Sequence, residues 1–583
     1  MDANRGRGGP SGPGRSPRRA TPWPDIGDSG GFPDPPPPMP VTERLRPALL
    51  ALCLAAGLAP VVAAAAQTST APVPPAPAAA PLPAGLDDLD AYVASVRRTF
   101  QVPGIAVAVV QDGRVVLARG WGERSLGGPA VDAHTQFAIA SNTKAFTSAA
   151  LYMLAEDGKL GLDDRVIDHL PWFRMADPVV TRELRIRDLL AHRSGLTLGA
   201  GDLLYWPTTD YSTRDVVERL GQVPLKGGFR DRYAYDNILF AVAQLVIEQA
   251  SGQRFAEFLQ QRIFDPLGMA ETRFNSDALR PGDPAATGYA LADGKTLEAA
   301  PRLTWHNASG AGGLYSSVHD MAIWMNVQLA GGVYRAADGR EHRLFTDKSQ
   351  QAMWQMVTPM TIPAPSVPEL TAARPNFLGY GQGWMLSDYR GERLVWHTGG
   401  WPGMVSRVTL APEKKLGVVV LTNAELGGAF NAITLRVLDA YIGAPKTDWN
   451  AAYGAALAKS KAKADDSWTR HVAARTGRRT PSRPLDAYAG TWRDPWYGDV
   501  IVSRDGDRLR LRFSRTQSLV GTLEHWQNDA FVVRWDERWL NADAFLTFAL
   551  DADGAPIEAR MEAISPNTDF SFDFQDLVLT PVK

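Results

Sequence analysis

Apolar residues in the first half of this chain form two kinds of pattern, uninterrupted runs and helical repeats. Residues 105–110 form an apolar run that continues, after Asp112-Gly113, into residues 115–118. Two short apolar runs joined by an Asp-Gly turn are typical of a β-hairpin, and the unbroken first run indicates a buried sheet strand. A second strand pair is predicted at residues 404–410 and 416–422.

The segments between these strand pairs carry apolar residues at helical spacing. Helices are predicted around Leu89–Val96, from Ser141 to near Gly158, over Ile238–Ala250 and over Val318–Leu329. Strands at both ends of a region with helices between them favour one antiparallel sheet flanked by helices. The predicted fold class is therefore α+β.

The pattern changes after residue 445. Residues 446–483 are rich in Ala and Lys, then in Arg, Gly and Pro, and they predict a helical or irregular connector. Short β-like runs then recur at regular spacing, at residues 500–502, 509–513, 531–535 and 545–548. This spacing predicts a small all-β barrel or sandwich over residues 484–583.

The N-terminal residues lack the pattern of a folded domain. Residues 1–38 are rich in Gly, Pro and Arg, which predicts a disordered segment or a mis-assigned start before Met39. Residues 39–66 place two arginines before an apolar run that ends in Ala64-Ala65-Ala66, the layout of a signal peptide. A membrane anchor is the alternative, but the run is short and rich in Ala. Residues 67–85 form a Pro/Ala-rich linker.

A signal peptide has consequences for the mature protein. We expect a periplasmic or secreted location, with no stable membrane span after cleavage. The single cysteine, Cys53, lies in the predicted signal segment, so the mature chain would have neither a disulfide nor thiol chemistry. The 583 residues are 45% hydrophobic and 21% charged, as in ordinary multidomain globular proteins. A net charge of −2 gives no nucleic-acid footprint, so no nucleic-acid partner is expected.

Ser141 and Lys144 are the strongest candidates for chemistry. They lie at the start of an apolar, Ala-rich helix, where residues three apart share one face. A serine hydroxyl needs a base to become a nucleophile, and a buried lysine can lose its charge and act as that base. The pattern alone is weak, because Ser460 and Lys463 repeat it in a polar, Lys-rich stretch where we expect only a solvated segment.

Two further segments could complete a serine site. Tyr235 and Asn237 precede the predicted helix at residue 238, where the tyrosine could relay a proton with a pKa lowered by the lysine cation. The asparagine amide could bond both lysine and a substrate carbonyl, although a turn with a helix cap is the simpler interpretation. His397, Gly399 and Gly400 precede the late strand pair. There the N–H of Gly400 and that of Ser141 could form an oxyanion hole.

Other chemistries lack their motifs. From residue 39 onward the chain has no His-Glu-x-x-His, Cys-x-x-Cys, phosphate-binding glycine loop or Gly-x-Ser-x-Gly elbow, and the glycines of residues 310–313 stand outside any dinucleotide fingerprint. We therefore predict neither a metal nor another cofactor. The segment 192–195 is interpreted as a structural turn.

In this order, Ser141-x-x-Lys144, Tyr235-x-Asn237 and His397-Thr398-Gly399 resemble the penicillin-recognising serine hydrolases. The resemblance is to the branch with class C β-lactamases, D-aminopeptidases, DD-carboxypeptidases and esterases, and it covers residues 86–445. It implies an all-helical subdomain beside the sheet. The tail, residues 484–583, resembles the lipocalin-like domain often fused to these hydrolases.

The resemblance also implies roles. Ser141 would be acylated, Lys144 would activate it, and Tyr235 would shuttle the proton, with Asn237, His397 and Gly399 orienting these groups and the substrate. The β-lactamases carry lysine where this chain has His397, and a neutral histidine holds a carboxylate less well. We therefore expect hydrolysis of an ester or amide bond, including those of D-amino-acid peptides, in a small-molecule or short peptide substrate.

Three alternatives stay open at this point. A class C-like β-lactamase or a DD-carboxypeptidase would use the same serine, and a non-catalytic binding protein could share the scaffold. The intact Ser141, Lys144 and Tyr235 argue against the binding protein, which need not keep all three. The sequence leaves the oligomeric state open.

Overall fold

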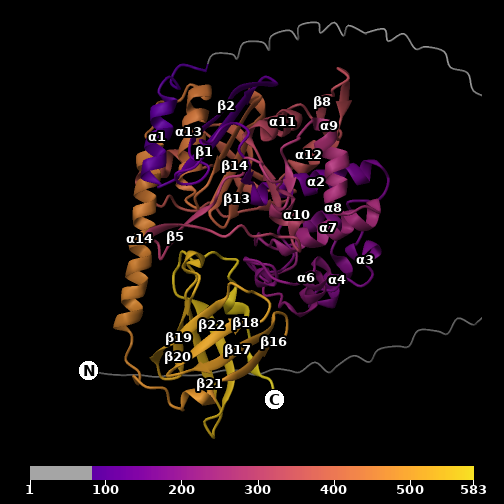
Figure 1. Ribbon diagram of the computed structural model, residues 1–583. Coiled ribbons are helices and arrows are strands. Elements are labelled where there is room, and N and C mark those ends of the chain that lie inside the picture. Colours follow the sequence, from indigo (N-terminus) through magenta and orange to yellow (C-terminus); the bar gives the residue numbers. More distant parts are fainter. Residues whose placement is uncertain (1–81) are drawn as a thin grey trace, which may run out of the picture. The chain divides into compact units, whose positions relative to one another are not determined.

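A computed structural model describes residues 82–583 (Figure 1). The predictions for residues 1–38 and 39–66, and all but the last residues of the 67–85 linker, lie outside the described part. Within residues 82–583 no helix is both long and apolar enough to cross a bilayer.

An eight-stranded antiparallel sheet forms the centre of the first half. Its strands follow the spatial order β10 (Thr358–Pro359), β11 (Leu378–Tyr380), β12 (Met385–Tyr389), β13 (Glu392–Trp401), β14 (Met404–Ala411), β15 (Leu416–Thr422), β1 (Gly104–Gln111) and β2 (Arg114–Gly122). The predicted hairpin and the predicted late strand pair are neighbours within this sheet. They meet where β1 lies beside β15, and Val107 of β1 pairs with Val420 of β15. The hairpin and the late strand pair predicted from the apolar runs are therefore confirmed.

Helices cover both faces of this sheet because its central strands are apolar on both sides. Ile105 and Val107 face a core shared with α1 (Leu89–Thr99) and α13 (Gly428–Ile442). Ala106 and Ala108 face the other core, shared with α2 (Thr143–Glu156) and α11 (Val318–Leu329). Figure 1 shows α1 beside α13 and α14, which brings the two ends of this region together.

A mostly helical region lies between the two strand pairs in the sequence and includes the segment of Tyr235 and Asn237. Its helices are α3 (Val166–His169), α4 (Pro178–Glu183), α5 (Ile186–Leu189), α6 (Thr213–Arg219), α7 (Ile238–Ser251), α8 (Phe255–Leu259) and α9 (Asp265–Leu267). The predicted helix at residue 238 is α7, which packs against α2 and α10 (Ser309–Gly312). A small sheet joins this region to the nucleophile segment, in the order β3 (Phe137–Ala138), β7 (Leu314–Ser316), β4 (Arg273–Phe274).

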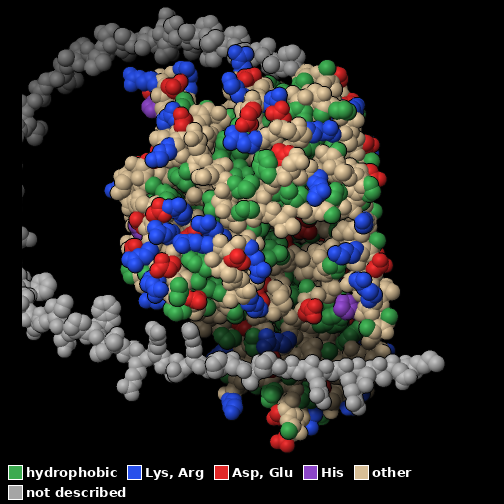
Figure 2. Space-filling model, turned by 180° about the vertical axis from the view of Figure 1, so that it is seen from behind, with side chains coloured by type: hydrophobic (Ala, Val, Ile, Leu, Met, Phe, Trp, Pro, Cys, Tyr) green, Lys and Arg blue, Asp and Glu red, His purple; other side chains and the backbone are tan. Residues whose placement is uncertain are grey.

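The remaining elements of this half are short. They are β5 (Tyr289–Ala292), β6 (Thr296–Ala299), β8 (Val333–Arg335), β9 (Glu341–Arg343) and α12 (Asp347–Met353). Basic and acidic side chains lie interspersed on the face shown in Figure 2, as a net charge of −2 leads one to expect.

The connector is mainly α14 (Trp449–Ala473), a single long helix, and the chain then forms an eight-stranded antiparallel barrel. The barrel strands are β16 (Gly490–Asp494), β17 (Gly498–Asp505), β18 (Arg508–Phe513), β19 (Val520–Gln527), β20 (Ala530–Trp535), β21 (Ala544–Leu550), β22 (Pro556–Ala563) and β23 (Thr580–Pro581). Ala559 and Leu579 pair across the two ends of the order and nearly close it. The predicted all-β barrel is thus present, with strands that follow one another in chain order.

Candidate active site

Ser141 lies at the junction between the small sheet and α2. It belongs to the short 3-10 turn η1 (Ala140–Asn142), and Lys144 follows in the first turn of α2. Ser141 is 9% exposed, whereas the side chain of Lys144 is fully buried. The three-residue spacing therefore places both side chains on one face, as the sequence predicts.

The Lys144 ammonium has three hydrogen-bond partners. Its Nζ lies 3.0 Å from Ser141 Oγ, 2.7 Å from Asn237 Oδ1 and 2.9 Å from the carbonyl oxygen of Ala311. Burial lowers the pKa of Lys144 to about 7, against the opposing charges of two buried carboxylates, Asp202 and Asp236. A lysine in this state is available as a base near neutral pH.

Tyr235 approaches the same oxygen from the loop before α7. Its Oη donates to Ser141 Oγ over 2.9 Å, so Lys144 and Tyr235 both contact the nucleophile. The sequence-based expectation that the lysine lowers the pKa of Tyr235 is wrong. Burial raises the pKa of this phenol well above its ordinary value, and neighbouring tyrosine and aspartate groups add to the effect. Tyr235 is therefore a protonated donor in the free protein.

The side chain of Asn237 accepts a hydrogen bond from Lys144, as predicted, and makes a second contact that was not predicted. Its Nδ2 donates to Asp202 Oδ2 over 2.9 Å and is not directed to a substrate carbonyl. The same Asp202 oxygen accepts from Ser571 Oγ, at 2.8 Å, on the segment that follows β22 of the barrel. Burial raises the pKa of Asp202 to about 7. Asp202 and Ser571 belong to no recognisable motif, so neither residue could be predicted from the sequence.

His397 lies on β13 rather than in a turn before the strand pair. Its Nδ1 donates to the carbonyl oxygen of Thr398 over 2.6 Å, which leaves Nε2 to accept from Tyr380 Oη at 2.9 Å. Burial lowers the pKa of His397 to about 3, so the ring is neutral, as expected. Both nitrogens are engaged within the protein. His397 therefore positions Tyr380 and does not offer an N–H to the substrate.

Gly399 and Gly400 differ in their surroundings. A Cβ on Gly399 would lie 2.2 Å from the carbonyl oxygen of Ile139 and 2.5 Å from Ser406 Oγ, so only glycine lets β13 pack this closely on the segment before Ser141. Gly400 is exposed, and a Cβ there would meet nothing within 4 Å. Strand β13 thus lies beside η1, and Gly400 is at the open side of this contact. The oxyanion role of the Ser141 and Gly400 N–H groups stays a prediction.

The 192–195 segment packs against Tyr235 and bonds the residues on either side of it. His192 is fully buried, its Nδ1 accepts from the backbone N–H of Asp236, and its carbonyl oxygen accepts from the N–H of Ala234. Ser194 Oγ donates to Asp236 Oδ2. This is a structural turn, as predicted.

The second Ser-x-x-Lys pair has none of these surroundings. Ser460 and Lys463 lie on α14, where Lys463 is exposed and Ser460 Oγ donates to Asn567 Oδ1. The two copies of the Ser-x-x-Lys motif therefore differ in burial, because Lys144 is buried whereas Lys463 is exposed.

Among residues 82–583, one group outside this site has side chains that could hold a metal ion. Donor atoms of His134, Glu271 and His319 lie within 4.8 Å of one another. Two histidines and a carboxylate suit a transition metal such as zinc. His134 Nδ1 and Glu271 Oε1 already form a hydrogen bond of 2.6 Å, which accounts for the cluster without a metal.

Comparison with known proteins identifies the first half of the chain. Residues 89–441, more than half of the chain, match the family model described as Beta-lactamase. The chain belongs to the Beta-lactamase family. It is a serine hydrolase, and the resemblance seen in the sequence is confirmed. Residues 474–581 match a domain of unknown function, DUF3471, and the lipocalin-like assignment of the barrel is not confirmed.

Individual relatives agree with this assignment. The chain is 29% identical over 486 residues to the unguisins hydrolase ungD of Aspergillus violaceofuscus. The aligned region covers 76% of this chain and 82% of the relative. It is 25% identical to protein flp of Staphylococcus aureus, over 58% of this chain and 62% of that protein.

Two solved structures share the fold. The octameric penicillin-binding protein homologue from Pyrococcus abyssi matches with a TM-score of 0.52 and 21% identity, over 84% of this chain and 99% of its own. The D-amino acid amidase from Ochrobactrum anthropi SV3 matches with a TM-score of 0.50 and 21% identity, over 60% of this chain and 99% of its own.

Proposed function

We propose that this Beta-lactamase family protein cleaves ester or amide bonds through an acyl-enzyme on Ser141. The observation that carries the proposal is the convergence of Lys144 Nζ and Tyr235 Oη on Ser141 Oγ, at 3.0 and 2.9 Å. A buried amine with a pKa of about 7 beside the hydroxyl supplies the base that serine requires.

The steps follow from these positions. Neutral Lys144 takes the proton of Ser141 as Oγ attacks the substrate carbonyl, and the Ser141 and Gly400 N–H groups bind the oxyanion. The scissile bond then breaks as Tyr235 delivers its proton to the leaving atom and regains one from Lys144 through the shared hydrogen-bond network. Water, activated by the same groups, hydrolyses the ester on Ser141 and releases the acid.

The surroundings of His397 favour ester and amide substrates over β-lactams or C-terminal carboxylates. A cationic lysine could hold a substrate carboxylate at this position, whereas His397 is neutral, 2% exposed and bonded to Tyr380 and Thr398. The fungal relative is named as a hydrolase of unguisins, and one structural neighbour as an amidase of D-amino acid amides. D-amino-acid peptides and amides therefore belong in the substrate panel.

Covalent labelling tests the nucleophile. A fluorophosphonate probe should add once to the wild-type protein, with the expected gain in intact mass, and Ser141→Ala should not react. The matched control is Ser460→Ala, which should label like wild type because Ser460 lies on α14 away from Lys144. Equal labelling of Ser141→Ala and wild type would refute the assignment. Rapid turnover of a chromogenic cephalosporin, compared with nitrophenyl esters and D-amino-acid anilides, would favour the β-lactamase alternative instead.

We also propose export to the periplasm or the medium, on the strength of residues 39–66. N-terminal sequencing of the protein purified from an expressing bacterium should give Gln67 as the first residue, after Ala64-Ala65-Ala66. Retention of the residues before Gln67 in a cell-associated protein would contradict this proposal.

A further inference from the structure

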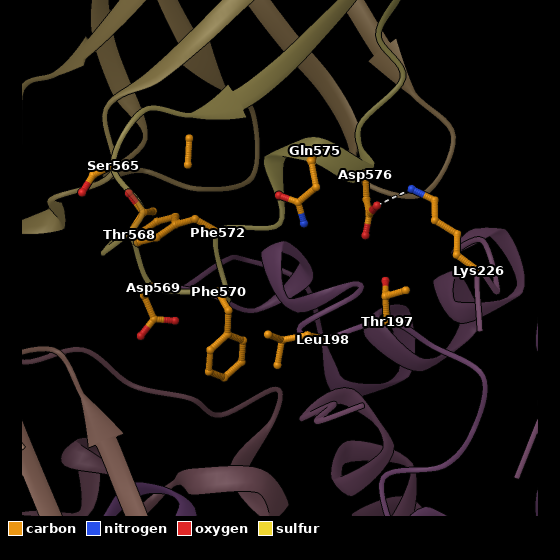
Figure 3. A pocket seen from close by; sticks show the side chains of 11 residues that line it. Thr197, Leu198, Lys226, Ser565, Thr568, Asp569, Phe570, Phe572, Gln575 and Asp576 are labelled. Carbon is orange, nitrogen blue, oxygen red and sulfur yellow. Dashed lines mark hydrogen bonds and ion pairs between the residues drawn. The ribbon is translucent and has the colours of Figure 1, made fainter. Parts of the chain in front are cut away.

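A pocket of about 500 Å³ opens beside the candidate catalytic tyrosine (Figure 3). Leu198 lines it from the hydrolase region, and Phe570 and Phe572 line it from the segment after β22. Figure 3 shows Phe570 and Leu198 side by side at the end nearer the hydrolase region. The Phe570 ring lies edge-on to the ring of Tyr235, with 5.8 Å between centroids. Phe570 therefore lines the pocket and also contacts the tyrosine that bonds Ser141.

The barrel wall of this pocket is held firmly in place. The Asp573 carboxylate accepts from the backbone N–H groups of Gly201 and Leu203, at 2.7 and 3.1 Å, and Ser571 bonds Asp202. Gly199 allows the close approach, because a Cβ there would lie 2.6 Å from the carbonyl oxygen of Phe570. These contacts fix Phe570 beside Tyr235, so the pocket is a built feature of the two-domain chain.

Two apolar side chains at this pocket remain uncovered. Leu198 is 50% exposed and Phe570 is 39% exposed, although Phe570 also contacts the ring of Tyr235. Lys226 and Asp576 form an ion pair at the opposite end (Figure 3). A ligand in the pocket would thus contact apolar surface near Tyr235 and charged groups farther away.

We propose that this pocket binds the leaving group of the substrate, and that the leaving group is apolar. The assignment rests on the proposed function, in which Tyr235 delivers a proton to the leaving atom. The leaving group must then lie on the Tyr235 side of Ser141. The Lys144 ammonium lies over the Tyr235 ring, 4.9 Å from its centroid, with Asn237 and Ala311 bonded to it, whereas Phe570 contacts the same ring from the pocket. The C-terminal barrel therefore supplies part of the substrate specificity.

A series of acetate esters of linear alcohols, from ethyl to hexyl, tests this proposal. All members give the same acetyl-enzyme, so differences in kcat/KM report the leaving group alone. In the wild-type protein kcat/KM should rise about fourfold for each added CH₂, as expected for burial of a methylene. The rise should flatten in Phe570→Ala and in Leu198→Ala. Ile557→Ala is the matched control, since Ile557 is an exposed apolar residue at the other end of β22 from the pocket.

The outcomes separate this inference from the proposed function. Failure of the fluorophosphonate to label Ser141 would overturn the function itself. Normal labelling with a flat alcohol series, or a series equally steep in both pocket variants, would overturn only the pocket assignment. A dependence on acyl length in methyl esters without one on alcohol length would also overturn it. Phe570→Leu keeps an apolar side chain, so it should restore most of the rise in kcat/KM with alcohol length. Such a recovery would show that the flat series in Phe570→Ala is not caused by misfolding.

Discussion

Lys144 shares the buried space around Ser141 with two carboxylic acids, Asp202 and Asp236. Burial lowers the pKa of Lys144 to about 7 and raises those of Asp202 and Asp236 to about 7. Each ionised carboxylate stabilises the protonated lysine and so opposes its use as a base. The protonation of Lys144 is thus governed by two carboxylates as well as by burial.

The first prediction concerns the pH dependence of acylation. Because only neutral Lys144 accepts the Ser141 proton, kcat/KM should rise with pH through neutrality. Asp202→Asn removes one negative charge and keeps an oxygen that can accept from Asn237 and Ser571. The pKa of Lys144 should then fall, and the rising limb of the pH profile should move to lower pH by about one unit. The profile is measured by nitrophenyl acetate hydrolysis over roughly two pH units on either side of the Lys144 pKa of about 7.

The control for this prediction is Asp163→Asn, which removes a carboxylate that is 59% exposed. Its profile should coincide with that of wild type. A limb that stays in place or moves to higher pH in Asp202→Asn would show that the Asp202 charge does not act on Lys144.

At the residue scale the sequence identified the polar groups around Ser141 but not their partners. Ser141, Lys144, Tyr235 and Asn237 do meet, as their motifs predicted. Asp202 lies 35 residues before Asn237, and Ser571 lies 369 residues after Asp202, so no local pattern connects them. The direction of the Tyr235 pKa shift also depends on burial, which a motif does not report.

At the scale of elements, the site depends on how closely strand β13 approaches turn η1. Antiparallel pairing with β14 sets Gly399 opposite Ser406, whose Oγ donates to the carbonyl oxygen of Ile139 at 2.8 Å and accepts from Asn142 Nδ2. The turn that carries Ser141 is therefore fastened to the sheet on both sides of the nucleophile. Any side chain at position 399 would have to displace this contact.

The second prediction compares two neighbouring glycines. Gly399→Ala should lower kcat/KM by about a hundredfold, because the new Cβ pushes β13 away from η1 and a shift of about 1 Å is costly in a catalytic site. Gly400→Ala keeps the backbone N–H and meets no atom within 4 Å, so its loss should be far smaller. Steady-state hydrolysis of nitrophenyl acetate and circular dichroism, to verify folding, provide the comparison. Equal losses in the two variants would refute the packing argument.

Sequence patterns predicted the most uniformly apolar strands but missed some long elements, among them helix α13 and strand β13. Residues 105–110 are apolar throughout and residues 416–421 are apolar apart from Gly417, and they form most of the buried strands β1 and β15. Strand β12 and the first part of β13 mix apolar with polar residues, so the pattern did not reveal them, and His397 was placed before a strand rather than within one. Four barrel strands, β17, β18, β20 and β21, were recognisable from their short β-like runs, whereas the other four strands and the contact of the barrel with the hydrolase region were not.

At the scale of the whole described chain, the barrel completes the catalytic neighbourhood. Asp573 is fully buried, and its carboxylate binds the backbone that presents Asp202. Burial and the nearby Asp202 raise the pKa of Asp573 well above its ordinary value. The two N–H groups that it accepts from would be left buried without it. The barrel therefore acts on Lys144 through Asp202 and Asn237, without contacting Ser141 itself.

The third prediction follows from this connection. Asp573→Ala should cost about 2 kcal/mol, the order expected for buried donors left unsatisfied, and should lower the thermal midpoint by a few degrees. It should also reduce kcat/KM for nitrophenyl acetate, since Asp202 loses its support and Asn237 no longer holds Lys144 firmly. Differential scanning fluorimetry and initial rates measure the two effects.

Asp536→Ala separates these effects from a general weakening of the barrel. Asp536 pairs with Arg510 on the barrel and is 49% exposed, so its removal should change stability by less than about 1 kcal/mol and leave the rate unaltered. Should Asp573→Ala lower the midpoint while kcat/KM stays at the wild-type value, the barrel would be a passive support. A fall in both would instead mean that the base, Lys144, is positioned jointly by two regions of the chain, because the path from Asp573 to Lys144 runs only through buried hydrogen bonds.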